Sequence, residues 1–206
     1  MKVILINGSP NEYGCTYTAL KEVESKLIEN KIETEIFWIG NKAISGCIGC
    51  KACTKTGKCF IDDNVNKFLE KAKLSDGFVF GSPVHFAASS GFLSCFMDRV
   101  FFKRKEVFSN KLGASISTCR RAGTISALDE INKYFSISNM PIVSSNYWNM
   151  VYGNTPDELK KDKEGMQNMR HLGNNMSWLL KCIECGKKNG VNLPNSESPI
   201  LTNFIR

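Results

Sequence analysis

The chain has 206 residues, 42% of them hydrophobic and 23% charged, which suits one globular domain over residues 1–206 and argues against a disordered or fibrous protein. The lysines and arginines behind the net charge of +7 are scattered among acids, so we expect no nucleic-acid partner. The sequence has no apolar run near the roughly 18 residues of a membrane helix and no signal-peptide pattern, which predicts a cytoplasmic protein with no membrane partner.

Apolar runs and helical periodicities alternate along the chain. Strands are predicted over residues 2–7, 34–39, 77–84, 111–119 and 141–145, and helices over 16–31, 63–74, 91–102 and 123–135. A last helical segment is expected within 157–188, with Gly165 and Gly173 as interruptions. Parallel neighbours need crossover connections, so this alternation predicts an α/β fold: a doubly wound five-stranded parallel sheet with helices on both faces.

In such a sheet, ligands bind at the carboxyl ends of the strands. The first loop, "GSPNEYGCTYT", offers hydroxyls at Ser9, Thr16 and Tyr17 or Thr18, a turn at Gly14 and the free N–H groups of the following helix. These are parts of a phosphate cradle. The loop has neither the lysine of a P-loop nor G-x-G-x-x-G, which disfavours ATP and NAD folds. A helix cap without a ligand is the alternative.

Two further loops reach the same edge of the predicted sheet. The loop "GSPVHFAASSG" is apolar enough to give backbone groups and a wall to a flat ring, although His85 and Phe86 taken alone are more often local packing than cofactor contacts. The loop "TCRRAGT" suits an anionic flavin edge or a nicotinamide phosphate, and its arginines could also be surface charges. The candidate residues are Pro83, Val84, His85 and Phe86 in the first of these loops, and Arg120, Arg121 and Gly123 in the second.

A cysteine-rich loop over residues 45–60 contains "CIGCKACTKTGKC", with Cys47, Cys50, Cys53 and Cys59 as candidate metal ligands. In a reducing cytosol the nine cysteines of the chain would stay thiols or bind metal more often than form disulfides. Four thiolates from one loop can hold a 4Fe-4S cluster, whereas a structural zinc usually draws on two separated C-x2-C pairs. A cluster, an empty reduced loop, and zinc or a disulfide remain open. The loop has little apolar content that would order it without a ligand.

At these loops the sequence resembles the flavodoxin-like NAD(P)H-dependent FMN reductases, and the cysteine loop resembles their iron-sulfur flavoprotein branch. The likeness runs from "ILINGSPNEYGCTYT" through "FGSPVHFAASSGFLSCFMDR" to "YWNMVYG". It implies a flavodoxin-like fold and FMN, with the phosphate at Ser9 and Thr16, Cys15 standing where Asn is common, and the isoalloxazine along residues 82–86. The spacing C-x2-C-x2-C-x5-C fits the cluster motif of that branch. A homodimer or homotetramer is implied too.

The same resemblance assigns the chemistry to the flavin, with NAD(P)H as co-substrate. We expect no catalytic side chain, in keeping with a sequence that has two histidines and no G-x-S-x-G motif. A reactive thiolate at Cys15, at a predicted helix N-terminus, is a minor alternative. The expected function is an NAD(P)H-dependent reductase of flavin, quinone or another small acceptor. The alternative is an electron-transfer protein between a ferredoxin-like donor and a downstream protein.

Overall fold

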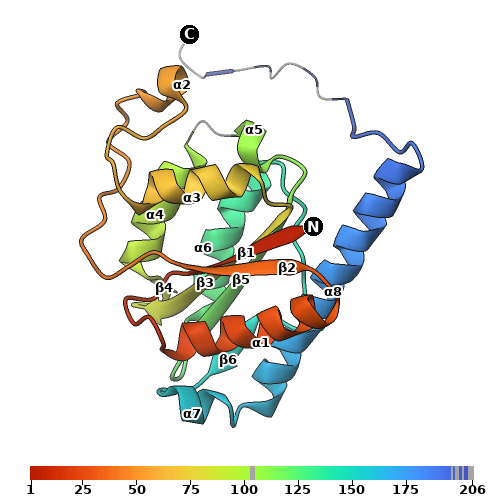
Figure 1. The fold of residues 1–206 in the computed structure, drawn as a ribbon. Coiled ribbons are helices and arrows are strands. Elements are labelled where there is room, and N and C mark those ends of the chain that lie inside the picture. The colour runs from red at the N-terminus through yellow and green to blue at the C-terminus, as the bar shows by residue number, and fades with distance from the viewer. Residues whose placement is uncertain (103–104, 196, 198–199, 201, 204–206) are drawn as a thin grey trace.

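The computed structural model describes residues 1–102, 105–195, 197, 200, 202 and 203 (Figure 1). The strands are β1 (Lys2–Asn7), β2 (Glu33–Trp38), β3 (Gly77–His85), β4 (Ala88–Ser89), β5 (Leu112–Cys119) and β6 (Met150–Tyr152). The helices are α1 (Cys15–Glu29), α2 (Cys53–Thr56), α3 (Asn64–Lys73), α4 (Gly91–Phe101), α5 (Lys105–Phe108), α6 (Thr124–Ile137), α7 (Pro156–Leu159) and α8 (Lys163–Lys188). Within this described part, no helix is long and apolar enough to cross a membrane.

Five of the strands form a parallel sheet in the order β2-β1-β3-β5-β6. The order reverses between β1 and β3, as in flavodoxin, and ligands of such sheets bind at this reversal. The predicted parallel sheet is therefore confirmed. A sixth strand was not expected: the chain turns back after β3, and β4 pairs with the end of β3 in antiparallel fashion.

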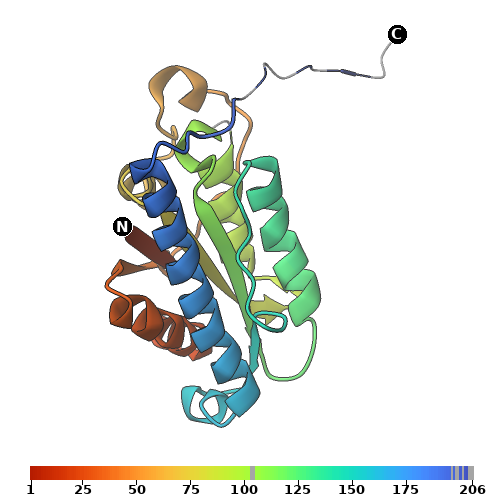
Figure 2. The same cartoon turned by 90° about the vertical axis from the view of Figure 1, so that its right-hand side faces the viewer.

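Side chains that alternate along the central strands divide the core into two layers. Val3 and Leu5 of β1 pack against α1 and α8, whereas Ile4 and Ile6 pack against α3, α4 and α6. Figure 2 shows α1 and α8 on one side of the sheet and α6 on the other. The second layer is rich in aromatic side chains, among them Phe68, Phe78, Phe80, Phe96 and Phe135.

The position of the last parallel strand differs from the prediction over residues 141–145. That segment meets β5 in one isolated bridge at Gly113, whose N–H donates to the carbonyl of Pro141. The chain then leaves the sheet in a turn, in which the Ser145 N–H donates to the side chain of Asn149. Pairing with β5 resumes at β6, inside the "YWNMVYG" stretch at which the family likeness ends.

The C-terminal helical segment consists of the short α7 and the long α8, and neither glycine interrupts α8. Asp162 caps α8 by accepting a hydrogen bond from the N–H of Gly165. Gly173 lies against α1, where an added Cβ would be 2.7 Å from the carbonyl oxygen of Val23. The glycine that looked like a break is therefore a point of close helix packing.

Candidate functional site

The first two predicted loops are joined at the point where the strand order reverses. The Gly8 N–H donates to the Gly81 carbonyl at 2.9 Å, and the Ser90 hydroxyl donates to the Gly8 carbonyl at 2.6 Å. An added Cβ at Gly8 would lie 2.7 Å from the Gly81 oxygen, so the two loops approach as closely as glycine allows. Ser90 also caps α4 by accepting from the Leu93 N–H. The edge of the sheet is thus fixed by one backbone hydrogen bond and by the Ser90 hydroxyl.

The loop before α1 is ordered by its own polar groups. Ser9 is buried, its N–H donates to Asn7 Oδ1, and its hydroxyl accepts from the Asn11 N–H. Trp38 Nε1 donates to the Ser9 carbonyl at 2.8 Å. At Gly14, the N-cap of α1, no described side chain makes a cap hydrogen bond, and the first turn has no acidic residue. The first N–H groups of α1 and the positive end of its dipole therefore suit an anion.

Thr16 and Cys15 are less accessible than the sequence suggested. Thr16 is 1% exposed, and its hydroxyl lies 3.0 Å from the hydroxyl of Thr118 at the end of β5. Cys15 is half-buried and its thiol donates to the Gly153 carbonyl at 3.6 Å. Burial raises the pKa of the Cys15 thiol, which disfavours the alternative of a reactive thiolate. Tyr17 is half-buried next to them.

Residues of the second loop form a hairpin between β3 and β4. Pro83 and Val84 are half-buried, whereas His85 and Phe86 are exposed, Phe86 fully. Phe86 and Ala87 have φ values of 52° and 59°, as the type I′ turn of a tight hairpin requires. Such angles are uncommon outside glycine and cost free energy in the folded state. The hairpin therefore presents an exposed ring on a strained turn.

The third loop packs directly on this hairpin. Gly123 has a φ of 91°, and an added Cβ there would lie 2.8 Å from Ala87 Cα and 3.0 Å from Val84 Cγ1. Arg120 and Arg121 are exposed at the end of β5, beside that contact. The structure thus brings Gly123 together with the hairpin and leaves both guanidinium groups open to solvent.

Sequence reasoning missed several residues that hold these loops. Asn7, Trp38 and Thr118 each lie at the carboxyl end of a strand, a position that marks them as candidates. Glu130 of α6 carried no such signal, yet its carboxylate accepts from the Ser89 N–H at 2.8 Å and from the Ser94 hydroxyl at 2.9 Å. It fastens β4, and with it the hairpin, to the body of the protein.

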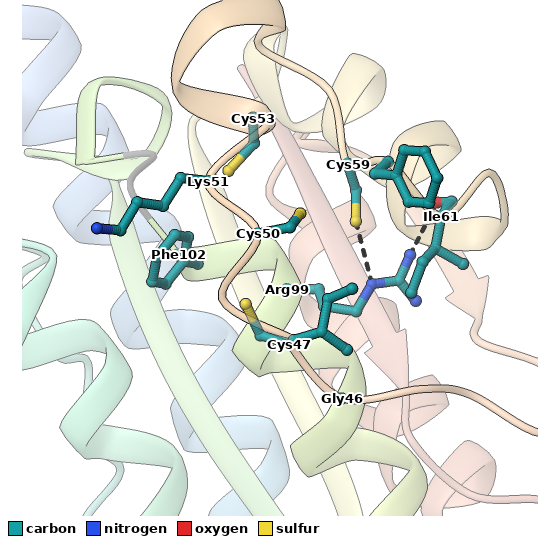
Figure 3. Close-up of a pocket in the computed structure, with 11 residues that line it drawn as sticks. Gly46, Cys47, Cys50, Lys51, Cys53, Cys59, Ile61, Arg99 and Phe102 are labelled. Atoms are coloured by element: carbon teal, nitrogen blue, oxygen red, sulfur yellow. Dashed lines mark hydrogen bonds between the residues drawn. The ribbon is translucent and has the colours of Figure 1, made fainter.

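All four cysteines of the 45–60 loop line one pocket, together with Arg99 of α4 and Phe102 (Figure 3). The pocket is narrow, with about 20 Å³ accessible to the centre of a water molecule. Cys47 and Cys50 are exposed, whereas Cys53 and Cys59 are half-buried. The four cysteines that are closely spaced in the sequence thus share one pocket in the fold.

The loop has an anchor that its composition did not reveal. Arg99 is 2% exposed, and its Nε donates to Cys59 Sγ at 3.2 Å. Its two terminal nitrogens reach Asp63 at 2.6 and 2.9 Å. Cys59 also packs against the aromatic layer of the core. These contacts give the loop a link to the core that its sparse apolar content did not suggest.

The four thiols line the pocket without converging on one point. Among the described residues, no three His, Cys, Asp or Glu side chains are gathered closely enough to hold one metal ion. A structural zinc needs four ligands around one ion, with sulfur at about 2.3 Å, whereas a 4Fe-4S cluster is held by four cysteines around a larger core. All nine cysteines are free thiols, so the disulfide alternative is wrong for this structure.

Comparisons with known sequences indicate one family, and solved structures share the fold. The model for NADPH-dependent FMN reductase matches residues 1–155. An iron-sulfur flavoprotein of Methanocaldococcus jannaschii is 34% identical over 196 residues, which cover 89% of this chain and 100% of the relative. The solved structure of RosB with the intermediate 8-demethyl-8-formylriboflavin-5'-phosphate superimposes with a TM-score of 0.70 at 14% identity, covering 100% of this chain and 94% of RosB. A flavodoxin from Archaea gives 0.59 at 13% identity, over 88% and 99% of the two chains.

Proposed function

The chain belongs to the NADPH-dependent FMN reductase family, and on this premise we propose that it binds FMN and uses NAD(P)H to reduce flavin, quinone or another small acceptor. The observation that carries the proposal is the convergence of three loops where the strand order reverses, beside an uncapped helix N-terminus. A terminal phosphate is the ligand that such a helix start accepts best. When bound, FMN supplies the hydride-accepting ring.

In this proposal the phosphate lies against Ser9 and the first N–H groups of α1, from Cys15 to Tyr17. The Ser9 hydroxyl is fixed by the Asn11 N–H, and Thr16 is fixed by Thr118, so these groups are positioned before FMN arrives. Preorganised donors of this kind lower the entropic cost of binding.

The ring of FMN would lie along the hairpin, against Pro83, Val84, His85 and Phe86. Gly123 brings the third loop onto the hairpin, and this contact supports a role for Arg120 and Arg121 at an anionic flavin edge or a nicotinamide phosphate. Exposure of Phe86 on a strained turn supports a functional role for its ring, because such strain is common at binding sites. Two exposed guanidinium groups also attract an anionic co-substrate.

A second candidate is electron transfer between a ferredoxin-like donor and a downstream protein. The shared pocket of Cys47, Cys50, Cys53 and Cys59 favours it, as does the name of the M. jannaschii relative. These four residues would hold a 4Fe-4S cluster, which relays single electrons.

We further propose that residues 1–206 form one domain and that the protein is cytoplasmic, in keeping with the free thiols. We also propose a homodimer or homotetramer, for which exposed Trp148 and Trp178 offer contact area.

Anaerobically purified protein tests both candidates. An absorbance spectrum with iron and acid-labile sulfide analysis should show bound FMN and a cluster. Steady-state turnover with NADPH should exceed turnover with reduced ferredoxin if the chain is primarily a reductase, and the reverse order would favour the relay. Protein that takes up no FMN on reconstitution would contradict the proposed function altogether.

A further inference from the structure

Arg99 of α4 connects both ends of the cysteine loop. One of its terminal nitrogens donates to the Ser45 carbonyl at 3.4 Å, before the first cysteine, and the other donates to the Ile61 carbonyl at 2.8 Å, after the last. Its Nε donates to Cys59 Sγ, and Cys59 lies between Ser45 and Ile61 in the sequence. One guanidinium thus bridges two segments separated by the whole cysteine motif.

The guanidinium is also held by an ion pair with Asp63. Asp63 forms a two-point ion pair with it, and Asp63 is itself fixed as the N-cap of α3 through the Val65 N–H. A buried charge is costly unless it is paired and hydrogen-bonded. Here the partners of Arg99 lie in different directions, and a planar guanidinium with five donors suits this arrangement better than an ammonium group does.

We propose that Arg99 is the positioning residue of the cysteine pocket. It closes the loop over residues 45–63 and holds Cys59 Sγ inside the pocket ahead of any metal. It also raises the reduction potential of a cluster bound there. This inference rests on the proposed cluster site, but its first part concerns only the order of the loop.

The effect on the potential follows from charge. Reduction adds an electron, and a hydrogen bond and a positive charge at a ligand sulfur stabilise the more negative state; hydrogen bonds to the sulfurs and net charge are among the factors that set the potential. Asp63 partly neutralises Arg99. Removing the cation and removing its carboxylate partner should therefore shift the potential in opposite directions.

The experiment uses the full chain with the variants Arg99→Lys, Arg99→Gln and Asp63→Asn. Asparagine is as good an N-cap as aspartate, so Asp63→Asn keeps α3 capped and removes the charge. Three quantities are measured: hydrogen exchange over residues 45–63 in cluster-free protein, iron and sulfide per chain after anaerobic reconstitution, and the cluster midpoint potential by EPR-monitored titration. FMN content reports on the fold. Arg170→Lys, which alters an ion pair with Glu22 on another face of the molecule, is the matched control.

We expect loop exchange to accelerate at least tenfold in Arg99→Lys and iron to fall below half of the wild-type content, with FMN content retained. In Arg99→Gln the one-electron equilibrium should shift at least tenfold toward the oxidised cluster. This shift lowers the midpoint potential by about 59 mV. It should shift upward in Asp63→Asn. Arg170→Lys should match wild type in all three measurements.

Wild-type loop exchange and iron content in Arg99→Lys would overturn the positioning role, and potential shifts of the same sign in Arg99→Gln and Asp63→Asn would overturn the electrostatic role. If Arg99→Gln does not fold, Arg99→Lys and Asp63→Asn decide: the first must accelerate loop exchange and the second must raise the potential. If the wild-type chain takes up no iron, the cluster proposal fails, and loop exchange alone decides whether Arg99 orders the loop.

Discussion

At the scale of single residues, Thr16 tests the proposed phosphate loop most directly. Thr16→Val removes the hydroxyl and leaves the backbone donors of α1 in place. A hydrogen bond to a charged group contributes about 1.5 to 3 kcal/mol, so we expect the Kd for FMN to rise about tenfold or more. Fluorescence titration of FMN into the cofactor-free protein measures it.

The matched control is Thr118→Val, because Thr118 is the hydroxyl partner of Thr16 within the protein. Its removal should change the Kd for FMN much less, by a factor of about three or below. Equal weakening by both variants would show that the two hydroxyls act by shaping the loop, and that Thr16 does not contact the phosphate.

Alkylation of Cys15 tests the reactive-thiolate alternative. Burial raises the pKa of the thiols of both Cys15 and Cys119, and the thiolate is the nucleophile in alkylation. At pH 8 we therefore expect iodoacetamide to modify both about tenfold more slowly than the exposed Cys182 and Cys185. Peptide mass spectrometry after timed quenching measures the rates. Modification of Cys15 ahead of Cys182 would restore the alternative.

At the scale of elements, Gly173 reports on the packing of α8 against α1. Gly173→Ala improves helix propensity by up to about 1 kcal/mol, yet its Cβ would meet the Val23 carbonyl and the Lys26 side chain. Overpacking costs about 1 to 3 kcal/mol, so we expect a net loss of about 1 kcal/mol in the free energy of unfolding. Urea denaturation measures the free energy of unfolding of this variant. Gly186→Ala is the control, because a Cβ at that position meets only ordinary contacts. That variant should gain stability, and equal effects would contradict the close contact.

The hairpin between β3 and β4 stores strain that glycine would relieve. Ala87→Gly removes a Cβ from a residue with positive φ, so we expect a gain of about 0.5 to 1 kcal/mol in the free energy of unfolding. Ala122→Gly makes the same chemical change in the adjacent loop, where φ is not positive. Ala122→Gly should therefore lower the free energy of unfolding by about 0.5 to 1 kcal/mol, because glycine gives the unfolded chain more conformational freedom. Thermal unfolding compares the two variants, and a loss in both would show that the turn is unstrained.

The elements differ in how far the sequence predicts them. Helices α1 and α3 follow from apolar residues on one face, and these residues are buried as expected. Strand β6 could not be predicted, because "PIVSS" has the better strand composition but bonds to β5 at one residue. Periodicity reports burial, and it carries no information on where two distant segments come into register.

At the scale of the whole molecule, α4 separates the two candidate sites. Ser90, the N-cap of α4, bonds to the loop after β1, whereas Arg99, in the last turn of α4, lines the cysteine pocket. Nine residues of helix span on the order of 13 Å. Figure 1 likewise shows β4 and α2 apart. The loop motifs were readable from the sequence, but this separation and the buried Arg99 depend on tertiary packing.

The separation predicts that the two sites fail independently. Cys50 is exposed and lines the pocket, so Cys50→Ser should remove one cluster ligand while the core stays intact. We expect iron and sulfide per chain to fall at least fivefold after anaerobic reconstitution, because metal binding depends on the full ligand set. FMN stoichiometry and the flavin-dependent oxidation of NADPH should stay near wild type, since the phosphate loop belongs to a different strand end. Cys182→Ser, an exposed cysteine on α8, is the control and should keep its iron. Joint loss of FMN and iron in Cys50→Ser would mean that the pocket and the phosphate loop form one cooperative unit.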